Sequence, residues 1–431
     1  MVILHKGQRA ASHELMPYLP IQDIEALTLP RGYKLLPLVR QRYEFELAAA
    51  EAKVLTPREA VERGAYFMAV GGQLTHHYQI AQATPSQVSP DASETRKMFF
   101  ESNRYAVAYA THGLFPYRGK FHPQMIKAII NIIGVKPGEI LLDPMMGSGT
   151  TLVEASTMGI HSVGVELSPF TVFMAKVKLS ALNLDTSEFP ALLKNADKVF
   201  DLFYNGNING QSQATFDVPP GVKQLAQLSY LDTLGYAQRR KTKSPKELFP
   251  GLLKRYLEAV KAFNDMRQVL RVRLGDWVVI NGDARELPVK DDSVDGIVFS
   301  PPYSFALDYV ENDRIQLEYL GVDIEKLKQS MAGLRRNGKG SKRDIEQRIQ
   351  LYYQDMGRIF QECARVLKSK HCCVVVIGSN TRQTGGIRLE KEFISLASTM
   401  NLHLCNHVVR EIEGIRNTMK EEHILFFWKA S

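Results

Sequence analysis

The sequence contains few cysteines and lacks any long apolar run. Its four cysteines, Cys363, Cys372, Cys373 and Cys405, are too few for a disulfide framework. We interpret them as reduced thiols in the core of a cytoplasmic protein. Because Cys372 and Cys373 should point to opposite faces of a strand, we expect no shared metal site there and no bound metal. No stretch reaches about 18 apolar residues, and the first residues lack the apolar segment of a secretory signal, so we expect neither a membrane span nor a signal peptide.

Positive charge is only slightly in excess. Lysine plus arginine number 54 against 46 for aspartate plus glutamate, which gives a formal net charge of +8. Such a surface suits a polyanionic partner, and it equally suits a basic protein that binds no nucleic acid. With 45% hydrophobic and 23% charged residues, the composition excludes disordered and fibrous classes. The 431 residues predict roughly two or three structural units.

From about residue 105, apolar strand segments alternate with helical segments. The expected strands are 139–142, 161–165, 277–280, 296–299, 372–377 and 424–428. The expected helices are 123–133, 150–158, 170–181, 355–367 and 390–400, and residues 43–63 also look helical with a break near Pro57. Alternation of this length predicts an α/β fold with a doubly wound, largely parallel sheet. Between about 185 and 275 the alternation is interrupted, and the basic stretch 236–273 predicts a basic helical insert.

A glycine-rich turn follows the first of these core strands. Asp143 ends the strand, and Gly147 and Gly149 lie in the turn before a helix. Glycines let the backbone approach a ligand closely, and the helix N-terminus offers unpaired N–H groups. Glu166 ends the next strand, where an acidic side chain can accept both ribose hydroxyls of a nucleoside. The pattern favours a nucleoside-bearing cofactor over a purely structural turn. Asp283, after the strand 277–280, is either an acceptor for an adenine amino group or a surface turn residue.

The segment Ser300-Pro301-Pro302-Tyr303 ends another apolar strand. Adjacent prolines stop the sheet and leave carbonyl oxygens free at the strand end. Those carbonyls and the Ser300 hydroxyl can accept hydrogen bonds from an amino group, and Tyr303 offers a flat face for stacking. The segment therefore predicts a site for the exocyclic amine of a nucleobase, as opposed to a simple proline-capped strand end.

Together, the segment 143–151 (DPMMGSGTT) and the downstream SPPY segment resemble the amino-group DNA methyltransferases that use S-adenosylmethionine. The flanking segments 112–117 (HGLFPY), 120–123 (KFHP) and 300–321 agree with this resemblance. It implies a Rossmann-like methyltransferase sheet with S-adenosylmethionine as cofactor, and a target base flipped out of duplex DNA. It also implies the following roles: Phe121, Asp143, Gly147 and Gly149 for the methionine moiety, Glu166 for the ribose, Asp283 for the adenine, Ser300, Pro301 and Pro302 for the target amine, and Tyr303 for stacking on the base.

The resemblance divides the chain into four parts. Residues 1–104 are an N-terminal extension without an assigned role, 105–184 are the cofactor half of the core, and 276–431 are its target-base half. Residues 185–275 are the basic insert, for which we expect contact with DNA phosphates. The residues expected to make these contacts are Arg239, Arg240, Lys241 and Lys243. A solvated basic helix pair is the alternative.

The exact target stays open at this point. Serine before the prolines favours cytosine N4 over adenine N6, whereas most serine-type enzymes place the two motifs in the opposite order. Other interpretations are a tRNA guanine-N2 methyltransferase, a protein glutamine methyltransferase and a DNA-binding protein that has lost activity. The expected partner is double-stranded DNA in a prokaryotic cytoplasm. We identify no nuclease motif, so any cognate restriction enzyme would be a separate protein. The sequence gives neither the recognition sequence nor the oligomeric state.

Overall fold

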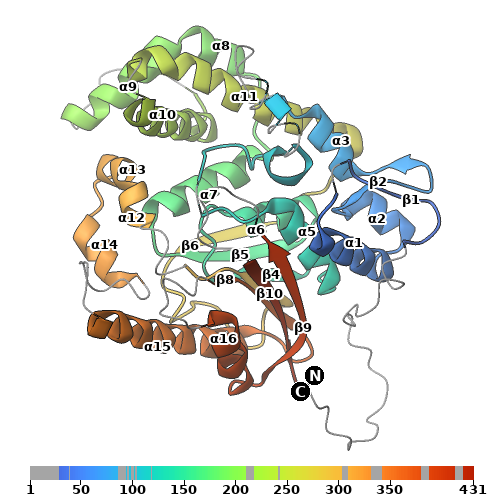
Figure 1. The fold of residues 1–431 in the computed structure, drawn as a ribbon. Helices are drawn as coiled ribbons and strands as arrows, with labels where there is room; N and C mark the ends of the chain where they lie inside the picture. Colours follow the sequence, from blue (N-terminus) through green and yellow to red (C-terminus); the bar gives the residue numbers. More distant parts are fainter. Residues whose placement is uncertain are drawn as a thin grey trace, which may run out of the picture.

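A twisted central sheet organises the fold (Figure 1). The computed structural model describes residues 29–37, 39–85, 94, 97–98, 101, 104–117, 119–209, 218–240, 243–302, 309–331, 342–379, 388–412 and 421–431. Within these residues the sheet has seven strands in the order β6-β5-β4-β7-β8-β10-β9. Their bounds are β4 (Ile140–Asp143), β5 (His161–Glu166), β6 (Trp277–Asn281), β7 (Gly296–Phe299), β8 (Cys372–Ser379), β9 (Leu402–Glu411) and β10 (Glu421–Lys429).

The strands from β6 to β8 are all parallel, and β10 is antiparallel to both of its neighbours, β8 and β9. The predicted doubly wound, largely parallel α/β sheet is therefore confirmed. The strand 402–411 is an addition to the prediction. It lies at the edge of the sheet, and several of its side chains are exposed.

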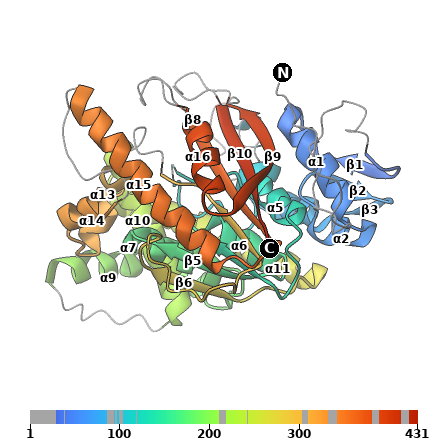
Figure 2. The same ribbon diagram turned by 90° about the horizontal axis from the view of Figure 1, so that it is seen from below.

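Helices cover both faces of the sheet (Figures 1 and 2). One face carries α5 (Pro123–Ile132), α6 (Thr150–Thr157) and α7 (Pro169–Ala181), and the other carries α15 (Lys342–Val366) and α16 (Leu389–Ser398). Successive residues of β8 alternate between the two cores: Cys372 packs with α5, and Cys373 packs with α15. The predicted opposite orientation of these cysteines is thus confirmed. Side chains of such buried strands each contribute about 1.5–3 kcal/mol to stability.

The N-terminal part packs beside α5 (Figure 2). It contains β1 (Tyr33–Leu35), β2 (Phe67–Val70) and β3 (Gln73–Leu74) in a small antiparallel sheet, with α1 (Arg42–Val54), α2 (Pro57–Arg63) and α3 (His76–Ala83). The helix break expected near Pro57 is confirmed, because Thr56 caps α2 through the Glu59 N–H and Pro57 opens it. A π-helical turn (Arg104–Ala108) follows. The residues considered for a secretory signal, within 1–28, lie outside the described residues.

Four helices occupy the interruption between β5 and β6, after α7. They are α8 (Phe189–Lys194), α9 (Ala196–Asn209), α10 (Pro220–Arg240) and α11 (Pro245–Leu270), and they share a core with α7. The expected helical insert is therefore present. Three short helices follow β7: α12 (Tyr309–Asn312), α13 (Arg314–Tyr319) and α14 (Ile324–Ser330). None of the helices in the described part is long and apolar enough to cross a bilayer.

Candidate active site

The sheet brings four of the predicted positions to one edge. Asp143 ends β4, Glu166 ends β5, Asp283 lies just after β6, and Ser300 follows the last residue of β7. These four strands are adjacent and parallel, in the order β6-β5-β4-β7, so their carboxyl ends lie side by side. The order reverses at β4, which pairs with β5 on one side and β7 on the other. Open α/β sheets bind ligands at such a switch point.

The turn after β4 requires its glycines. Gly147 and Gly149 have φ angles of +48° and +78°, in the left-handed region that disfavours other residues. A Cβ atom on Gly149 would lie 2.9 Å from the Cβ of Ala175 on α7. Gly149 precedes α6 directly, so the turn presents the N-terminus of this helix at the edge of the sheet.

Glu166 fixes this turn through its carboxylate. Its Oε2 accepts the Gly147 N–H at 2.9 Å, and its Oε1 accepts the Ser168 N–H at 2.9 Å. Desolvation by the surrounding protein raises the pKa of Glu166 above its ordinary value, against the lowering effect of these N–H groups. The carboxylate predicted to hold a ribose thus also shapes the glycine turn.

Buried polar atoms without partners surround the turn. Asp143 is fully buried; its Oδ1 accepts the Met145 N–H at 3.1 Å, and its Oδ2 forms no hydrogen bond within the described residues. Burial raises the pKa of this carboxyl to about 7. The hydroxyls of Ser148 and Thr150 are also buried without partners there. Burying such groups unpaired is costly, so this part of the chain fits a polar ligand that supplies the missing hydrogen bonds.

Tyr117 lies against the glycine turn, and Tyr309 lies beside Gly119. A Cβ atom on Gly119 would lie 2.6 Å from Cε1 of Tyr309 and 3.2 Å from Cε1 of Tyr117. A Cβ atom on Gly147 would lie 3.7 Å from the same Tyr117 atom. Tyr117 therefore lies between the turn and α12. Phe121, expected to assist the cofactor, is partly buried and packs on the core around α5.

Asp283 is held by a neighbouring arginine. Its two carboxylate oxygens accept from Arg285 at 2.5 to 3.1 Å, and Arg285 also binds Asp355 of α15 at 3.0 Å and the Ser330 carbonyl at 2.7 Å. The Asp283 carboxylate is therefore oriented by an ion-pair network that also binds the C-terminal end of α14. Sequence reasoning missed Arg285, although its place two residues after Asp283 was a usable signal.

The Ser300 segment leaves β7 beside β4 and β8. Ser300 is partly buried, Pro301 is buried, and the Tyr352 hydroxyl donates to the Pro302 carbonyl at 3.3 Å. The Pro302 carbonyl is thus already engaged by α15. Tyr303 lies outside the described residues.

The lysines and arginines of α11 are paired within the protein. Its five basic residues each have an acidic or amide partner: Lys246 binds Asp201, Lys254 binds Glu258, Arg255 binds Asp232, Lys261 binds Asp265, and Arg267 binds the Asn183 side chain. Of the predicted contacts, Lys243 is exposed between α10 and α11. Arg239 and Arg240 end α10, but their side chains and the whole of Lys241 lie outside the described residues. The cations of α11 therefore interact with partners inside the protein, and the expected phosphate contacts at 239–243 stay a prediction.

The insert also contacts the segment that precedes α5. The Phe115 N–H donates to the Tyr256 hydroxyl of α11 at 2.8 Å, and this hydroxyl donates to Asp232 of α10 at 3.1 Å. Phe115 has a φ of +61°, an uncommon conformation for this residue type. Tyr256 therefore secures a strained backbone position two residues before Tyr117.

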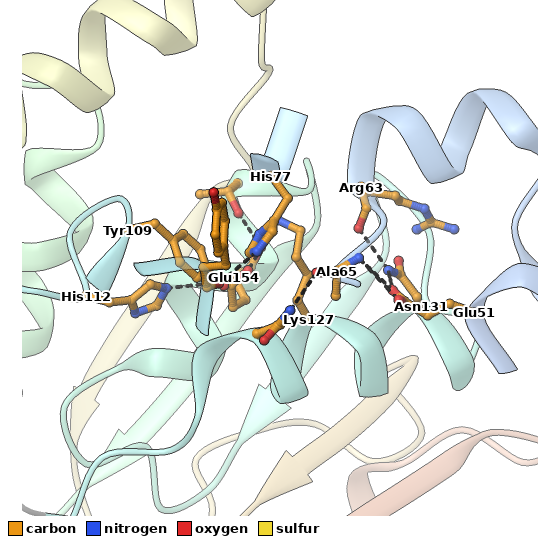
Figure 3. Close-up of polar contacts among 12 residues, drawn as sticks. Glu51, Arg63, Ala65, His77, Tyr109, His112, Lys127, Asn131 and Glu154 are labelled. Carbon is orange, nitrogen blue, oxygen red and sulfur yellow. Dashed lines mark hydrogen bonds and ion pairs between the residues drawn. The ribbon is translucent and has the colours of Figure 1, made fainter. Parts of the chain in front are cut away.

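The helix that begins at the glycine turn, α6, carries a buried carboxylate, which Figure 3 shows among its hydrogen-bond donors. Glu154 of α6 is fully buried and accepts from the Tyr109 hydroxyl at 2.7 Å, from His112 Nε2 at 2.6 Å and from Lys127 Nζ at 3.4 Å. Although burial opposes it, this cationic and hydrogen-bonding environment lowers the pKa of Glu154 to about 2. Burial lowers the pKa of His112 to about 4, so the imidazole is neutral at pH 7 and donates through Nε2. Sequence reasoning did not identify this cluster.

The described residues contain no group of three or more His, Cys, Asp or Glu side chains arranged to hold a metal ion. Their four cysteines are free, and three of them are buried.

Comparisons with known proteins agree on the chemistry of this site. Residues 114–201, which include the glycine turn, Glu166 and Tyr117, match the family described as an RMKL-like methyltransferase domain. These features support a methyltransferase. The Rossmann-like sheet that the resemblance implied is present as well.

Three curated relatives are similar to parts of this chain. The Type II methyltransferase M.MjaII of Methanocaldococcus jannaschii is 45% identical over 73 residues, 17% of this chain and 14% of the relative. The Type II methyltransferase M.BsoBI of Geobacillus stearothermophilus is 23% identical over 295 residues, 53% of this chain and 57% of the relative. The tRNA (guanine(10)-N2)-dimethyltransferase of Methanothermobacter thermautotrophicus is 40% identical over 53 residues, 12% of this chain and 16% of the relative. The chain therefore spans 14% to 57% of these relatives' lengths.

Proposed function

We propose that the chain transfers a methyl group from S-adenosylmethionine to the exocyclic amine of a flipped DNA base, with cytosine N4 favoured over adenine N6. One observation carries the proposal: the glycine turn with Glu166 and the Ser300-Pro301 segment leave adjacent strands on the two sides of the switch point at β4. A cofactor site and an amine-accepting site at neighbouring strand ends are what direct methyl transfer needs.

The residues present fit the cofactor. Asp143 and the turn at Gly147 and Gly149 would hold its methionine moiety, Glu166 its ribose and Asp283 its adenine. The buried, unpartnered Oδ2 of Asp143 supports this assignment, because an ammonium group would supply the missing donor. When bound, S-adenosylmethionine supplies an already activated methyl group.

The chain's own contribution to the transfer is positioning. An aromatic amine is a weak nucleophile because its lone pair is delocalised into the ring. Hydrogen-bond acceptors fixed on its N–H groups expose that lone pair and hold it in line with the methyl group. Because Tyr352 occupies the Pro302 carbonyl, we assign the accepting role to the Ser300 hydroxyl and the Pro301 carbonyl. Tyr303 would stack on the base, which must leave the duplex to reach this edge.

The names of two relatives support DNA as the substrate, since both are Type II methyltransferases. Such an enzyme would protect DNA from a cognate restriction enzyme, which we expect to be a separate protein. A second candidate is guanine N2 of transfer RNA, because one relative is a tRNA guanine-N2 enzyme. The serine at position 300 favours the DNA substrate.

A labelling experiment tests the reaction. Labelled S-adenosylmethionine is incubated with the full chain and either unmethylated genomic DNA or bulk transfer RNA, and the products are digested to nucleosides. We expect label in N4-methylcytosine. Label in N6-methyladenine would correct the target base, label only in RNA guanine would favour the second candidate, and no label in either would refute a nucleic acid substrate.

Replacing Ser300 tests the amine-accepting site. Ser300→Ala should lower kcat on the order of 10²-fold, as loss of one positioned hydrogen-bonding group does, and leave the cofactor Kd unchanged. Ser398, which is exposed at the end of α16, provides the control variant Ser398→Ala. Equal rates for both variants would remove Ser300 from the mechanism.

The turn between α10 and α11 is our proposed phosphate-contacting element. Replacing Arg239, Arg240 and Lys241 together by alanine should weaken DNA binding. It should also make the slope of log K against log salt concentration shallower by about 0.9 for each phosphate that the variant no longer neutralises. Lys254→Ala is the matched control, because Lys254 is paired with Glu258 at 3.7 Å. An unchanged salt slope in the triple variant would favour a solvated helix pair.

A further inference from the structure

Asp313 is a buried carboxylate without a structural role of its own. It occupies the position before α13 where an aspartate ordinarily caps the helix, but its side chain makes no capping hydrogen bond. Asp323 shows the ordinary case in the same region, since its carboxylate accepts the Lys326 N–H at 3.0 Å and caps α14. Asp313 is only 7% exposed, and no described residue donates a hydrogen bond to its side chain. Helix capping therefore does not explain this buried acid.

The surroundings of Asp313 belong to the cofactor side of the active site. Its N–H donates to the Tyr309 carbonyl at 3.2 Å, so Asp313 lies one helical turn beyond Tyr309. The Tyr309 ring neighbours Tyr117 at Gly119. Burial, and then the nearby Glu166 carboxylate, raise the pKa of Asp313 to about 7. Tyr117 in turn lies against Gly147, whose N–H the Glu166 carboxylate accepts at 2.9 Å, so a short series of contacts connects Asp313 with Glu166.

Within the described part of the chain, no cationic side chain neutralises the carboxylates of this site. Asp143, Glu166 and Asp313 form no ion pair with any lysine or arginine of the described residues, and Arg314, next to Asp313, binds Glu311 and Glu318 instead. Within the described residues the completely buried Oδ2 of Asp143 also has no hydrogen-bond partner, which independently indicates a polar ligand at this site. Grouped carboxylates in a desolvated site favour a cationic ligand, because a cation relieves both the repulsion and the burial cost.

We propose that Asp313 is a specificity-determining residue that makes the site prefer the cationic cofactor to its neutral demethylated product. This inference rests on the proposed function. S-adenosylmethionine carries a sulfonium charge, whereas S-adenosylhomocysteine carries a neutral thioether, and both share the ribose, adenine and amino acid groups. The hydrogen bonds assigned to Glu166 and Asp283 hold both molecules alike. A nearby carboxylate adds attraction only for the sulfonium form, and the loss of that charge on transfer weakens the hold on the product.

Calorimetric titration of the full chain at pH 8 tests the inference without catalysis. Asp313→Asn keeps the size of the side chain and removes its charge. We expect this variant to bind S-adenosylmethionine on the order of tenfold more weakly, as the loss of one charge interaction predicts, and to bind S-adenosylhomocysteine within about twofold of the wild type. Sinefungin, which carries an amine in place of the sulfonium, should follow S-adenosylmethionine. Asp323→Asn, which removes an acid on the neighbouring helix, should change neither Kd.

The outcomes separate the inference from the proposed function. If Asp313→Asn weakens both cofactor forms equally, or neither, Asp313 does not select charge, and the methyltransferase proposal stands. If the wild type binds neither form, the proposed function itself fails. Asp313→Glu retains the charge and should retain the preference for S-adenosylmethionine. If Asp313→Glu and Asp313→Asn lost this preference to the same extent, the result would also contradict the inference. Thermal unfolding without ligand establishes that each variant is folded.

Discussion

Replacing Glu154 by glutamine tests the physical interpretation of the buried network in Figure 3. Glu154 is fully buried, and its two oxygens accept from Tyr109, His112 and Lys127. Glutamine preserves the shape, but it removes the negative charge that balances the buried Lys127 ammonium. Its NH₂ group would also face donors in place of an acceptor. We therefore expect Glu154→Gln, which replaces one carboxylate oxygen by an NH₂ group, to cause a large loss of stability.

The structure sets the size of the effect. Breaking a buried ion pair by removing one partner costs about 3–5 kcal/mol, because the other charge stays buried without compensation. A domain has a total stability of only about 5–15 kcal/mol. Glu62 provides the matched control: it pairs with Arg58 at 2.9 Å, with side chains 47% and 88% exposed. Glu62→Gln should cost less than about 1 kcal/mol, because water screens an exposed pair.

Urea unfolding of the full chain at pH 7 measures both variants. The double variant Glu154→Gln with Lys127→Met should recover part of the loss, since it removes the stranded cation as well. The pKa of Glu154 lies near 2, below its ordinary 4.5. Its contribution is therefore present above about pH 4.5 and is lost as the pH falls toward 2, so wild type and Glu154→Gln should converge in acid. Equal midpoints for Glu154→Gln and Glu62→Gln at pH 7 would refute the reasoning.

Two further substitutions test the surroundings of the glycine turn. Gly149→Ala should destabilise the chain by at least about 1–2 kcal/mol, the cost of a left-handed residue with a Cβ atom, and it should weaken cofactor binding, because the new Cβ would press on Ala175. Gly251→Ala, where a Cβ atom would meet nothing within 4 Å, is its control in the same unfolding and titration assays. Tyr256→Phe should cost about 1–3 kcal/mol by leaving the Phe115 N–H without its acceptor, and an unfolding midpoint equal to that of wild type would contradict this role.

Much of the fold could be predicted from local patterns. Strands such as β8, with its run of valines, are buried on both faces and so read as continuous apolar segments. The edge strand β9 escaped prediction because its sequence, LHLCNHVVRE, mixes polar and apolar residues without strict alternation. The strands of the N-terminal sheet are two to four residues long, too short to carry a periodic signal. Pairing in the folded chain defines these strands: β1 pairs with the distant β2, and β3 pairs with β2 across a short turn.

In the candidate site too, some residues could be predicted from local sequence patterns and others only from the folded structure. Asp143, Gly147, Gly149, Glu166 and Ser300 could be selected because a short motif and its spacing predict their place at strand ends. Asp313 belongs to no such motif, and only its burial next to Tyr309 in the folded chain draws attention to it. The partners of the α11 cations could not be predicted either, because residues such as Asp201 and Asp232 are distant from them in the sequence.

The buried carboxylate of Glu154 connects stability to the geometry of the active site. Glu154 lies in α6, whose N-terminus begins at the glycine turn, while its donors Tyr109 and His112 precede the strained Phe115 and the ring of Tyr117. A single carboxylate thus joins α6 to the chain segment that precedes Phe115 and Tyr117. Movement of either segment would displace the Tyr117 ring relative to Gly147. The polar core beneath this site therefore has a positional role that an apolar core of equal stability could not supply, because hydrogen bonds fix direction as well as distance.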